Sequence, residues 1–378
     1  MSFKLLQLFF TFGKILALTP SSTHPEKQST SKIYSVVVFL VLTLASLASL
    51  QSKRFYMHFI HIRTIISYLT DFSFFGFHFC VIVVVSFWKR EQWSELLDNL
   101  RVVENLTGVR KSCESRFTRY GGVVAAHAIY FTVTFCGVGF WYRISNTLYF
   151  QQHAVRQIEH YIQFFYKYVL AILLKMILEK YQEVNVLLTT LLQYRQKLRT
   201  DFFSVYDPLL FNLKKTEYAL CLLKRTVNIF NDLFGWPIFF IILHTTFQIM
   251  NHVSYAIFNT TGFHLLVVVA ASLSLTLVSC FGGILSKLLV MTVIVIFMCD
   301  RVVQEAEKIV PLTYQLRWCY KSGTREEKQE LYEFSNFVTE NLPSFSAANF
   351  FLLQKSTVLS ILSTVSTVII IMIQFAGK

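Results

Sequence analysis

The sequence predicts an all-α, polytopic membrane protein with seven transmembrane helices, a cytoplasmic N-terminus and an extracellular C-terminus. Of the 378 residues, 54% are hydrophobic and 15% are charged, whereas a soluble globular chain carries about 25% charged residues. The apolar residues gather in runs of about 20, the length that a helix needs to cross a bilayer. This composition excludes a soluble enzyme, a secreted disulfide scaffold and a disordered protein.

The basic residues decide the number of spans and their orientation. The net charge is +13, and Lys and Arg gather on the cytoplasmic side of membrane proteins. With seven spans and the N-terminus inside, the inner segments carry 26 of the 35 Lys and Arg residues and the outer segments carry 6. An eighth span within the apolar stretch 263–299 would weaken this asymmetry. We therefore predict seven spans, in the orientation opposite to that of a G-protein-coupled receptor.

The N-terminal half is expected to hold four spans. Residues 1–32 predict an amphipathic cytoplasmic segment on the inner membrane face, because Gln7 and Lys14 interrupt its apolar run and argue against a cleaved signal peptide. Residues 33–178 contain transmembrane helices one to four, and a charged loop over 88–120 separates the second from the third. The four spans are expected at 33–50, 64–87, 121–142 and 160–178.

The C-terminal half is expected to hold three spans. A cytoplasmic helical extension, 179–232, follows the fourth span, because its Leu and Val residues recur at helical spacing. Residues 233–300 contain helices five and six, with the fifth at 233–258. A cytoplasmic region over 301–355 then leads to the last transmembrane helix, 356–375.

The motifs of known catalytic sites do not occur in the sequence. There is no Walker A loop, no H-E-x-x-H or G-x-S-x-G motif and no C-x-x-C pair, and His58 and His61 have no third metal ligand beside them. We therefore expect no enzyme activity, no cofactor, no bound metal and no nucleic-acid partner. Asn259 begins an N-x-T sequon in the predicted outer loop 259–262 and is the candidate glycosylation site.

The last span carries a polar stripe on an otherwise apolar helix. Ser360, Ser363, Thr364, Thr367 and Gln374 recur at offsets that place them on one helical face. Two interpretations stay open. The hydroxyls could bond their own backbone or pack against a neighbouring helix. Alternatively, the stripe lines a water-filled path, and an uncharged stripe suits a weakly selective cation pore better than a proton relay.

Polar and aromatic residues also gather in the predicted outer halves of the other spans. In the fifth span the spacing of four such residues, from 248 to 255, places them on one helical face. A pocket for an amphipathic small molecule needs flat rings and a few polar groups, although an interfacial aromatic belt has a similar composition. The candidate ligand-binding residues are Tyr68, Trp141, Tyr161, Gln248, Asn251, His252 and Tyr255.

Several blocks of the C-terminal half resemble a known family. Residues 367–375, T-V-I-I-I-M-I-Q-F, are similar to the T-Y-(five apolar)-Q-F signature of insect gustatory receptors. The blocks N-D-L-F-G-W-P (231–237), C-D-R-V-V-Q-E-A (299–306), F-S-A-A-N-F-F (345–351) and K-S-T-V-L (355–359) resemble the same family, in the same order. The chain looks most like the moth and butterfly members.

The resemblance implies a subunit of a ligand-gated, non-selective cation channel. Four subunits, identical or mixed with other gustatory receptors, would surround one pore lined by the seventh helix. The inner parts of 179–232 and 301–350 would form the anchor where subunits meet, and the gate would lie at the outer end of the last helix. The pore and gate residues would be Gln374, Phe375, Thr367, Ile371, Thr364 and Ser360.

The resemblance also implies the place and the kind of ligand. The protein would be a multi-pass protein of the plasma membrane, in the dendrite of a gustatory neuron, surrounded by lipid and binding a small-molecule tastant. Val368 stands where the signature has Tyr. Sugar-sensing members usually carry Glu where this chain has Ile369, which favours a bitter plant compound over a sugar.

Two other classes of membrane protein remain as alternatives. A secondary transporter predicts two similar halves with broken helices at matching positions, and the sequence has no such repeat. A G-protein-coupled chemoreceptor predicts the opposite orientation, against which the distribution of Lys and Arg argues.

Overall fold

The computed structural model describes residues 3–19, 28–54, 61–108, 116–144, 147–198, 208–261, 289–319 and 324–376. Most of these residues are helical, as the sequence predicts, and the strands among them form a two-stranded hairpin. In chain order the elements are α1 (Phe3–Ile15), α2 (Gln28–Arg54), α3 (His61–His78), the π-helix η2 (Phe79–Trp88), α4 (Arg90–Thr107), α5 (Arg116–Ile144), α6 (Thr147–Leu198), α7 (Pro208–Thr261), a helix over 289–307, α9 (Ile309–Cys319), α10 (Arg325–Glu340), β1 (Ser346–Ala347), β2 (Phe351–Leu352) and α11 (Lys355–Ala376).

Four helices in the described part of the chain are long and apolar enough to cross a membrane, and they overlap the predicted second, fourth, fifth and seventh spans. Their bounds are Thr64–Val85, Gln157–Tyr194, Leu213–Val253 and Lys355–Met372. Shorter apolar helical segments, Lys32–Leu44 and Gly121–Cys136, cover part of the predicted first and third spans. Most of the predicted sixth span, over 262–288, lies outside the described residues.

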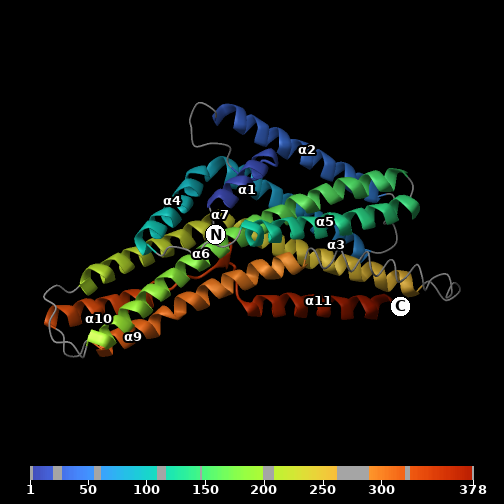
Figure 1. Ribbon diagram of the computed structural model, residues 1–378. Coiled ribbons are helices and arrows are strands. Elements are labelled where there is room, and N and C mark those ends of the chain that lie inside the picture. Colours follow the sequence, from blue (N-terminus) through green and yellow to red (C-terminus); the bar gives the residue numbers. More distant parts are fainter. Residues whose placement is uncertain are drawn as a thin grey trace.

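The helices α6 and α7 are much longer than a bilayer is thick. At about 1.5 Å per residue, their 52 and 54 residues extend about 78 and 81 Å, against a hydrocarbon core of about 30 Å. The predicted extension 179–232 is therefore the continuation of α6 and the beginning of α7. Figure 1 shows both helices reaching the same end of the molecule, where α9 packs against α6 and α10 packs against α7.

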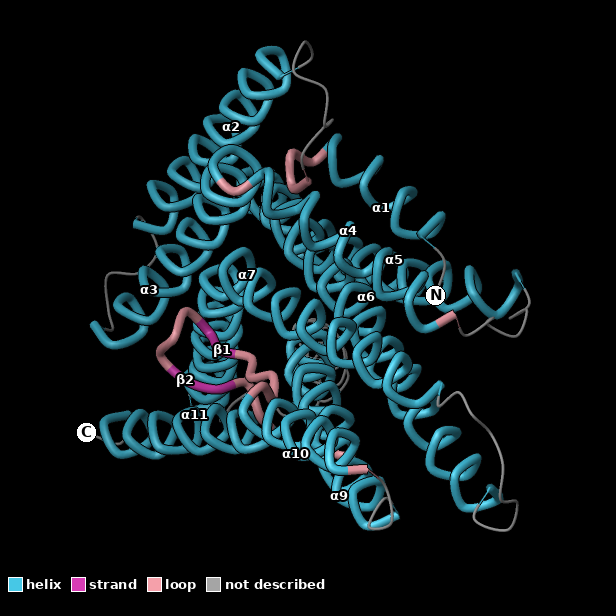
Figure 2. The backbone as a smooth tube through the Cα atoms, turned by 90° about the vertical axis from the view of Figure 1, so that its left-hand side faces the viewer, coloured by secondary structure: helices cyan, strands magenta, loops and turns pink. Residues whose placement is uncertain are grey.

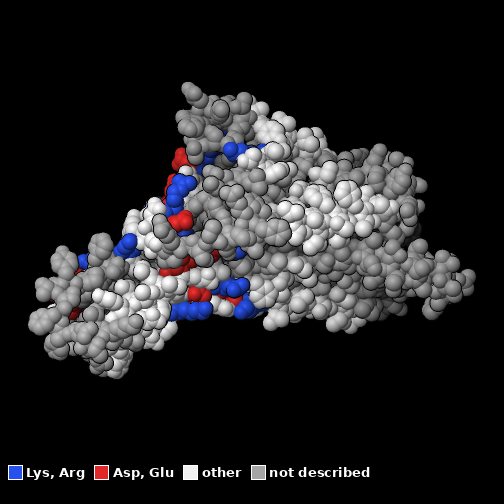
Figure 3. Space-filling view, viewed as in Figure 1, with Lys and Arg blue, Asp and Glu red and all other residues white. Residues whose placement is uncertain are grey.

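The last helix and the charged residues mark two different parts of the molecule. α11 packs along α7 at the edge of the bundle, and the small hairpin lies beside the same helix (Figure 2). On the face shown in Figure 3, most of the visible Lys, Arg, Asp and Glu residues lie over α4 and in a band below it, toward the beginning of α11. The described residues visible at the other end are uncharged. This division is the one expected between a membrane part and an aqueous part.

The predicted charged loop 88–120 contains a helix, so that prediction is wrong over Arg90–Thr107. Within α4, the buried residues recur every third or fourth position from Trp93 to Val103, which is the pattern of an amphipathic helix. Its charged residues lie on the other faces of the helix rather than in a loop. Gly108, with φ of 62°, ends α4 in the left-handed conformation that glycine adopts without steric cost.

The N-terminal helix α1 packs one face against protein, while Phe12 and Ile15 on its other faces are exposed. Leu6 and Phe9 are 2% and 3% exposed. Phe9 contacts Phe165 of α6, with ring centroids 5.8 Å apart. Phe10 meets Trp93 of α4 edge to face at 5.3 Å. The apolar face of α1 therefore joins α4 to α6 inside the bundle.

A β-hairpin that the sequence did not predict connects α10 to α11. The strands β1 and β2 pair antiparallel. The two turn residues, Ala348 and Asn349, have φ of 50° and 62°, as the two central residues of a type I′ turn require. Phe350 closes the turn by donating its N–H to the carbonyl of Ala347 at 2.9 Å. The hairpin sets the direction in which the chain enters α11.

Candidate ligand and pore site

The helix α11 has three faces in the described structure. One face is buried against the bundle, and its members are Ile361, Val365 and Met372. A second face, with Leu359, Leu362 and Ile370, is exposed and mostly apolar. The third face is exposed and mostly polar, with Ser360, Thr364, Thr367, Ile371 and Gln374. The structure therefore brings five of the six predicted pore residues onto one uncovered face, and the side chain of Phe375 lies outside the described residues.

The hydroxyls on this polar face bond the backbone of their own helix. Ser360, Thr364 and Thr367 each donate to the carbonyl four residues earlier, at 3.1, 2.9 and 3.0 Å. Because a hydroxyl oxygen keeps acceptor lone pairs after it donates its hydrogen, the face still presents oxygen acceptors outward. The two interpretations of the stripe are thus compatible. Hydroxyl oxygens whose hydrogens are already donated to the backbone suit a passing cation better than an anion.

The start of α11 is fixed by contacts with α7. Asn231 donates its side-chain amide to the carbonyl of Ser344 at 2.8 Å and accepts the N–H of Ser346 at 3.2 Å. One turn later, a Cβ at Gly235 would lie 3.0 Å from the backbone nitrogen of Ala348, so the hairpin backbone lies directly on that glycine. A polar cavity of about 450 Å³ opens beside this contact. Lining it are Asn228, Asn231, Asp232, Ser344, Ser346, Asn349, Phe350, Phe351 and Leu352.

The predicted stripe on the fifth span lies partly inside the bundle. Gln248 is 4% exposed, and its Nε2 is 3.3 Å from Nε2 of His252. Asn251 and His252 are half-buried. Tyr255 lies on the same helix, but its side chain is outside the described residues. The stripe therefore points from the bundle interior toward its edge.

The other predicted ligand residues lie on different helices. Tyr161 of α6 is half-buried in an aromatic cluster with Tyr130 and Phe131 of α5, at centroid distances of 5.4 and 5.2 Å. Tyr68 is 47% exposed on α3. Trp141 lies in α5, with its side chain outside the described residues. The aromatic cluster around Tyr161 and the polar stripe of α7 are thus two separate features of the bundle.

The candidate glycosylation site also differs from the expectation in one respect. The sequence predicts Asn259 in a short loop over 259–262, whereas α7 continues to Thr261. Asn259 therefore lies in the last turn of a helix. Its side chain is outside the described residues.

The core of the bundle contains polar residues that lie outside the predicted set of ligand-binding residues. His78 of α3, Gln163 and Tyr166 of α6 and His244 of α7 are each at most 3% exposed. Nδ1 of His244 lies 3.2 Å from the carbonyl of Thr70, which joins α7 to α3. The available signal is the presence of His and Gln within apolar runs, since polar groups inside membrane helices are costly and usually serve a function.

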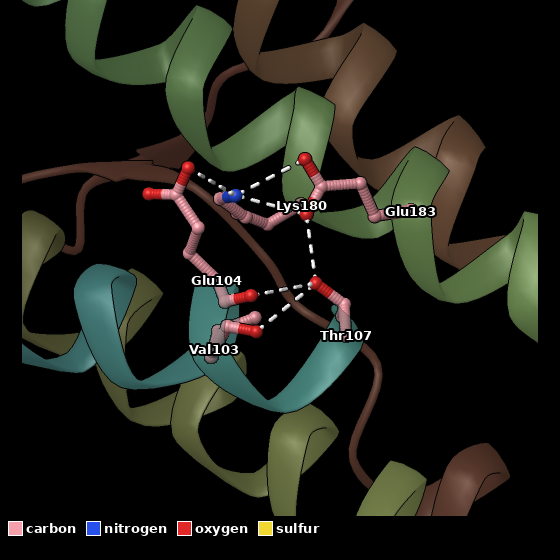
Figure 4. Close-up of polar contacts among 5 residues, drawn as sticks. All are labelled: Val103, Glu104, Thr107, Lys180 and Glu183. Carbon is pink, nitrogen blue, oxygen red and sulfur yellow. Dashed lines mark hydrogen bonds and ion pairs between the residues drawn. The ribbon is translucent and has the colours of Figure 1, made fainter. Parts of the chain in front are cut away.

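A second buried polar cluster joins α4 to α6 (Figure 4). The carboxylate of Glu183 accepts hydrogen bonds from Lys180 at 2.8 and 3.0 Å and from the hydroxyl of Thr107 at 2.9 Å. Glu104 lies 3.9 Å from the same ammonium group. A few residues further, Asn185 donates to both the carbonyl and the carboxylate of Glu305, each at 2.8 Å. These contacts fix α4 and the helix over 289–307 on the long helix α6.

Comparison with known proteins gives one family and one fold. The family profile described as "7tm Chemosensory receptor" matches residues 6–376. The structure is similar to that of the insect olfactory receptor OR5 from Machilis hrabei, with a TM-score of 0.63, 12% sequence identity and coverage of 98% of each chain. OR5 in complex with eugenol is similar to the same extent, with a TM-score of 0.64, 13% identity and the same coverage. No curated protein matches the chain.

Proposed function

Because the chain belongs to the 7tm chemosensory receptor family, we propose that it is a subunit of a cation channel that a small molecule opens. The observation that carries this proposal is the geometry of α11. A membrane helix that buries one face, leaves a second face mostly apolar and exposes a third face of hydroxyl and amide groups is suited to turn that third face toward a water-filled path. In a single chain the polar face has no covering helix among the described residues.

The proposed orientation has seven spans, with the N-terminus inside and the C-terminus outside. The surplus of Lys and Arg in the inner segments supports it, as does the high share of charged residues in α4 and α10. We assign 1–32, 179–232 and 301–355 to the cytoplasm on these grounds. The protein would then be a multi-pass protein of the plasma membrane.

The proposed assembly is a tetramer, with identical or related subunits, around one pore. Four copies of α11 would turn the face of Ser360, Thr364, Thr367 and Ile371 toward the axis, with Gln374 and Phe375 at the outer gate. The inner parts of α6 and α7, with α9 and α10, would form the contacts between subunits. The exposed apolar face of α11 would meet lipid or a neighbouring subunit.

The proposed ligand is a small amphipathic tastant, more specifically a bitter plant compound. The sequence blocks that resemble gustatory receptors and Ile369 in the last helix support a taste role in a gustatory neuron. The complex of OR5 with eugenol supports a small-molecule ligand. The candidate contacts in this chain remain Tyr68, Trp141, Tyr161, Gln248, Asn251, His252 and Tyr255.

The first experiment is a current measurement in voltage-clamped cells that express this chain alone. The cells are challenged with plant alkaloids, glycosides and sugars. We expect a reversible inward cation current in response to one of the alkaloids or glycosides. Gln374→Ala and Ser360→Ala, on the polar face of α11, should change its ion selectivity or its open time.

The matched control is Ser366→Ala. Ser366 is also exposed, but its position on the helix is turned away from the polar face. Equal effects of Ser360→Ala and Ser366→Ala on ion selectivity would contradict a pore lined by that face. An N-terminal epitope tag that antibodies reach on intact cells would contradict the orientation and favour a G-protein-coupled chemoreceptor. A steady uphill uptake of a solute with no ligand-gated current would favour a secondary transporter.

A further inference from the structure

Two apolar segments of the bundle reach their first charged residues at the same level. Lys89 follows the apolar segment that ends at Trp88. On α7, Asp232 is followed by no Asp, Glu, Lys or Arg up to Thr261. Lys89 donates its ammonium group to the backbone carbonyl of Asp232, so the two ends lie together. Because charged side chains stay in water, this level is the boundary between the membrane part and the aqueous part.

Exposed aromatic rings lie at this boundary. Trp88, Trp236 and Phe350 are 68%, 46% and 65% exposed. Trp236 of α7 meets Phe350 of the hairpin edge to face at 5.8 Å, and Phe239, one turn further along α7, is 5.1 Å from Phe350. Trp residues gather where a membrane protein meets the headgroups of the lipids. The rings of Trp236, Phe239 and Phe350 therefore form an apolar surface suited to lipid chains.

The polar cavity between α7 and the hairpin adjoins this apolar surface, because Phe350 belongs to both. Figure 2 shows the hairpin lying beside α7 above the beginning of α11. The volume of the cavity, about 450 Å³, is within the range of about 300–1,000 Å³ that is usual for small-molecule sites. Asn228 and Asp232 line it from one face of α7, since they are four residues apart. Among the described residues, no Lys or Arg lines the cavity.

The polar side chains of the cavity differ in whether they already have partners. Asn231 holds the backbone of the hairpin, and the hydroxyl of Ser346 donates to Oδ1 of Asn349 at 3.0 Å. Asn228 and Asp232 are exposed, and their side chains form no hydrogen bond or ion pair within the part of the chain that the structure describes. One carboxylate and one amide oxygen are therefore available as acceptors for a ligand.

We propose that this cavity binds the ethanolamine headgroup of a phospholipid whose acyl chains lie against Trp236 and Phe350. A primary ammonium group carries a positive charge and three N–H donors, which suit the carboxylate of Asp232 and the amide oxygen of Asn228. The phosphate of the same headgroup is negative, and Lys89 supplies a positive charge beside Asp232. One carboxylate and one ammonium group are thus the complement of a zwitterionic headgroup.

The same groups discriminate against two other common headgroups. Choline has the same charges but no N–H donors, and it is recognised by aromatic rings that enclose it. In the described cavity both rings, those of Phe350 and Phe351, come from the hairpin alone. A serine headgroup adds a second carboxylate, which Asp232 would repel.

The test uses the purified full-length chain in detergent micelles and counts bound lipids by native mass spectrometry. The protein is titrated separately with dioleoyl phosphatidylethanolamine and dioleoyl phosphatidylcholine, which have identical acyl chains. We expect the first phosphatidylethanolamine to bind about tenfold more tightly, because only its ammonium group donates hydrogen bonds to charged and polar acceptors. Asp232→Asn should remove this preference and leave the affinity for phosphatidylcholine unchanged.

Two further variants separate recognition of the headgroup from other effects. Asp98→Asn is the matched control, since Asp98 is 59% exposed on α4 and its replacement changes the net charge equally. It should keep the preference. Trp236→Ala should weaken the binding of both lipids by the same factor and also keep the preference, because the ring contacts acyl chains that the two lipids share.

The inference is overturned if the two lipids bind equally, if Asp232→Asn keeps the preference, or if Asp98→Asn loses it. The same spectra report the number of subunits. A change in that number in Asp232→Asn, with no change in lipid preference, would show that a second copy of the chain covers the cavity. The measurement needs neither a tastant nor a current, so its failure would leave the proposed channel standing.

Discussion

Replacing Lys180 with Met removes the positive charge from the buried cluster between α4 and α6. The side chains of Lys180 and Glu183 are 2% and 9% exposed, and the ammonium group lies 2.8 Å from the nearer carboxylate oxygen. In the variant the buried carboxylate keeps the hydrogen bond from Thr107 but loses this partner. Removing one member of a buried ion pair costs about 3–5 kcal/mol, because the remaining charge is left without compensation. Glu104 adds little to this figure, since it is 39% exposed and 3.9 Å away.

The cost converts into a measurable shift of the thermal midpoint. An unfolding entropy of about 2.1 cal/mol/K per residue gives about 0.8 kcal/mol/K for 378 residues. A loss of about 3–5 kcal/mol then lowers the midpoint by about 4–6 °C. The assay is unfolding in lipid nanodiscs, followed by tryptophan fluorescence.

Two further variants show whether the buried charge is the cause. The double variant Lys180→Met with Glu183→Leu removes both charges and should recover most of the loss, because an apolar pair replaces a buried ion pair at little cost. Lys214→Met is the exposed control, since Lys214 and its partner Glu330 are 66% and 36% exposed, and it should shift the midpoint by less than about 1 °C. The reasoning is refuted if Lys180→Met behaves like Lys214→Met, or if the double variant is as unstable as the single one.

Two other substitutions test how the remaining elements are held. Gly235→Ala should destabilise the protein by about 1–3 kcal/mol, because the new Cβ would press on the backbone of Ala348, and it should also reduce any ligand-gated current. Gly122→Ala is the control, because no atom lies within 4 Å of the added Cβ, and it should be neutral or stabilise the protein by up to about 1 kcal/mol. Thermal midpoints that shift in the same direction for both glycine variants would contradict this account. Asn185→Leu should lower the free energy of unfolding by about 1–3 kcal/mol in the same assay, because it leaves the carbonyl and carboxylate of Glu305 without their amide donor. An unchanged midpoint would show that water replaces that donor.

Composition and periodicity predicted the elements that depend on local pattern. The apolar runs place the spans because a helix of about 20 apolar residues is stable in a bilayer whatever its neighbours. The stripe on the last helix lies on an uncovered face, as the spacing of Ser360, Thr364 and Thr367 indicated. Its role as a pore lining, and the number of subunits around it, stay predictions.

Other features depend on tertiary contacts and could not be read in the same way. The density of charge between 88 and 120 concealed the apolar periodicity of α4. The packing of Phe9 and Phe10 requires a partner surface from α4 and α6, which the N-terminal sequence does not specify. Gln163 and His78 lie within apolar runs, and only the packing of the helices shows that both side chains are buried. The hairpin before α11 was missed because its strands are two residues each.

The uninterrupted length of α6 has a mechanical consequence. A rod of about 78 Å that tilts by 3° about its midpoint moves each end by about 2 Å, with no loop along it to absorb the motion. α7 is slightly longer but carries Pro237 within it, which removes one backbone hydrogen bond and weakens the helix locally. Pro237 lies two residues beyond Gly235, where the hairpin rests. α6 can therefore tilt as one rigid helix, whereas α7 can bend at Pro237. That bend lies beside the hairpin that leads into α11.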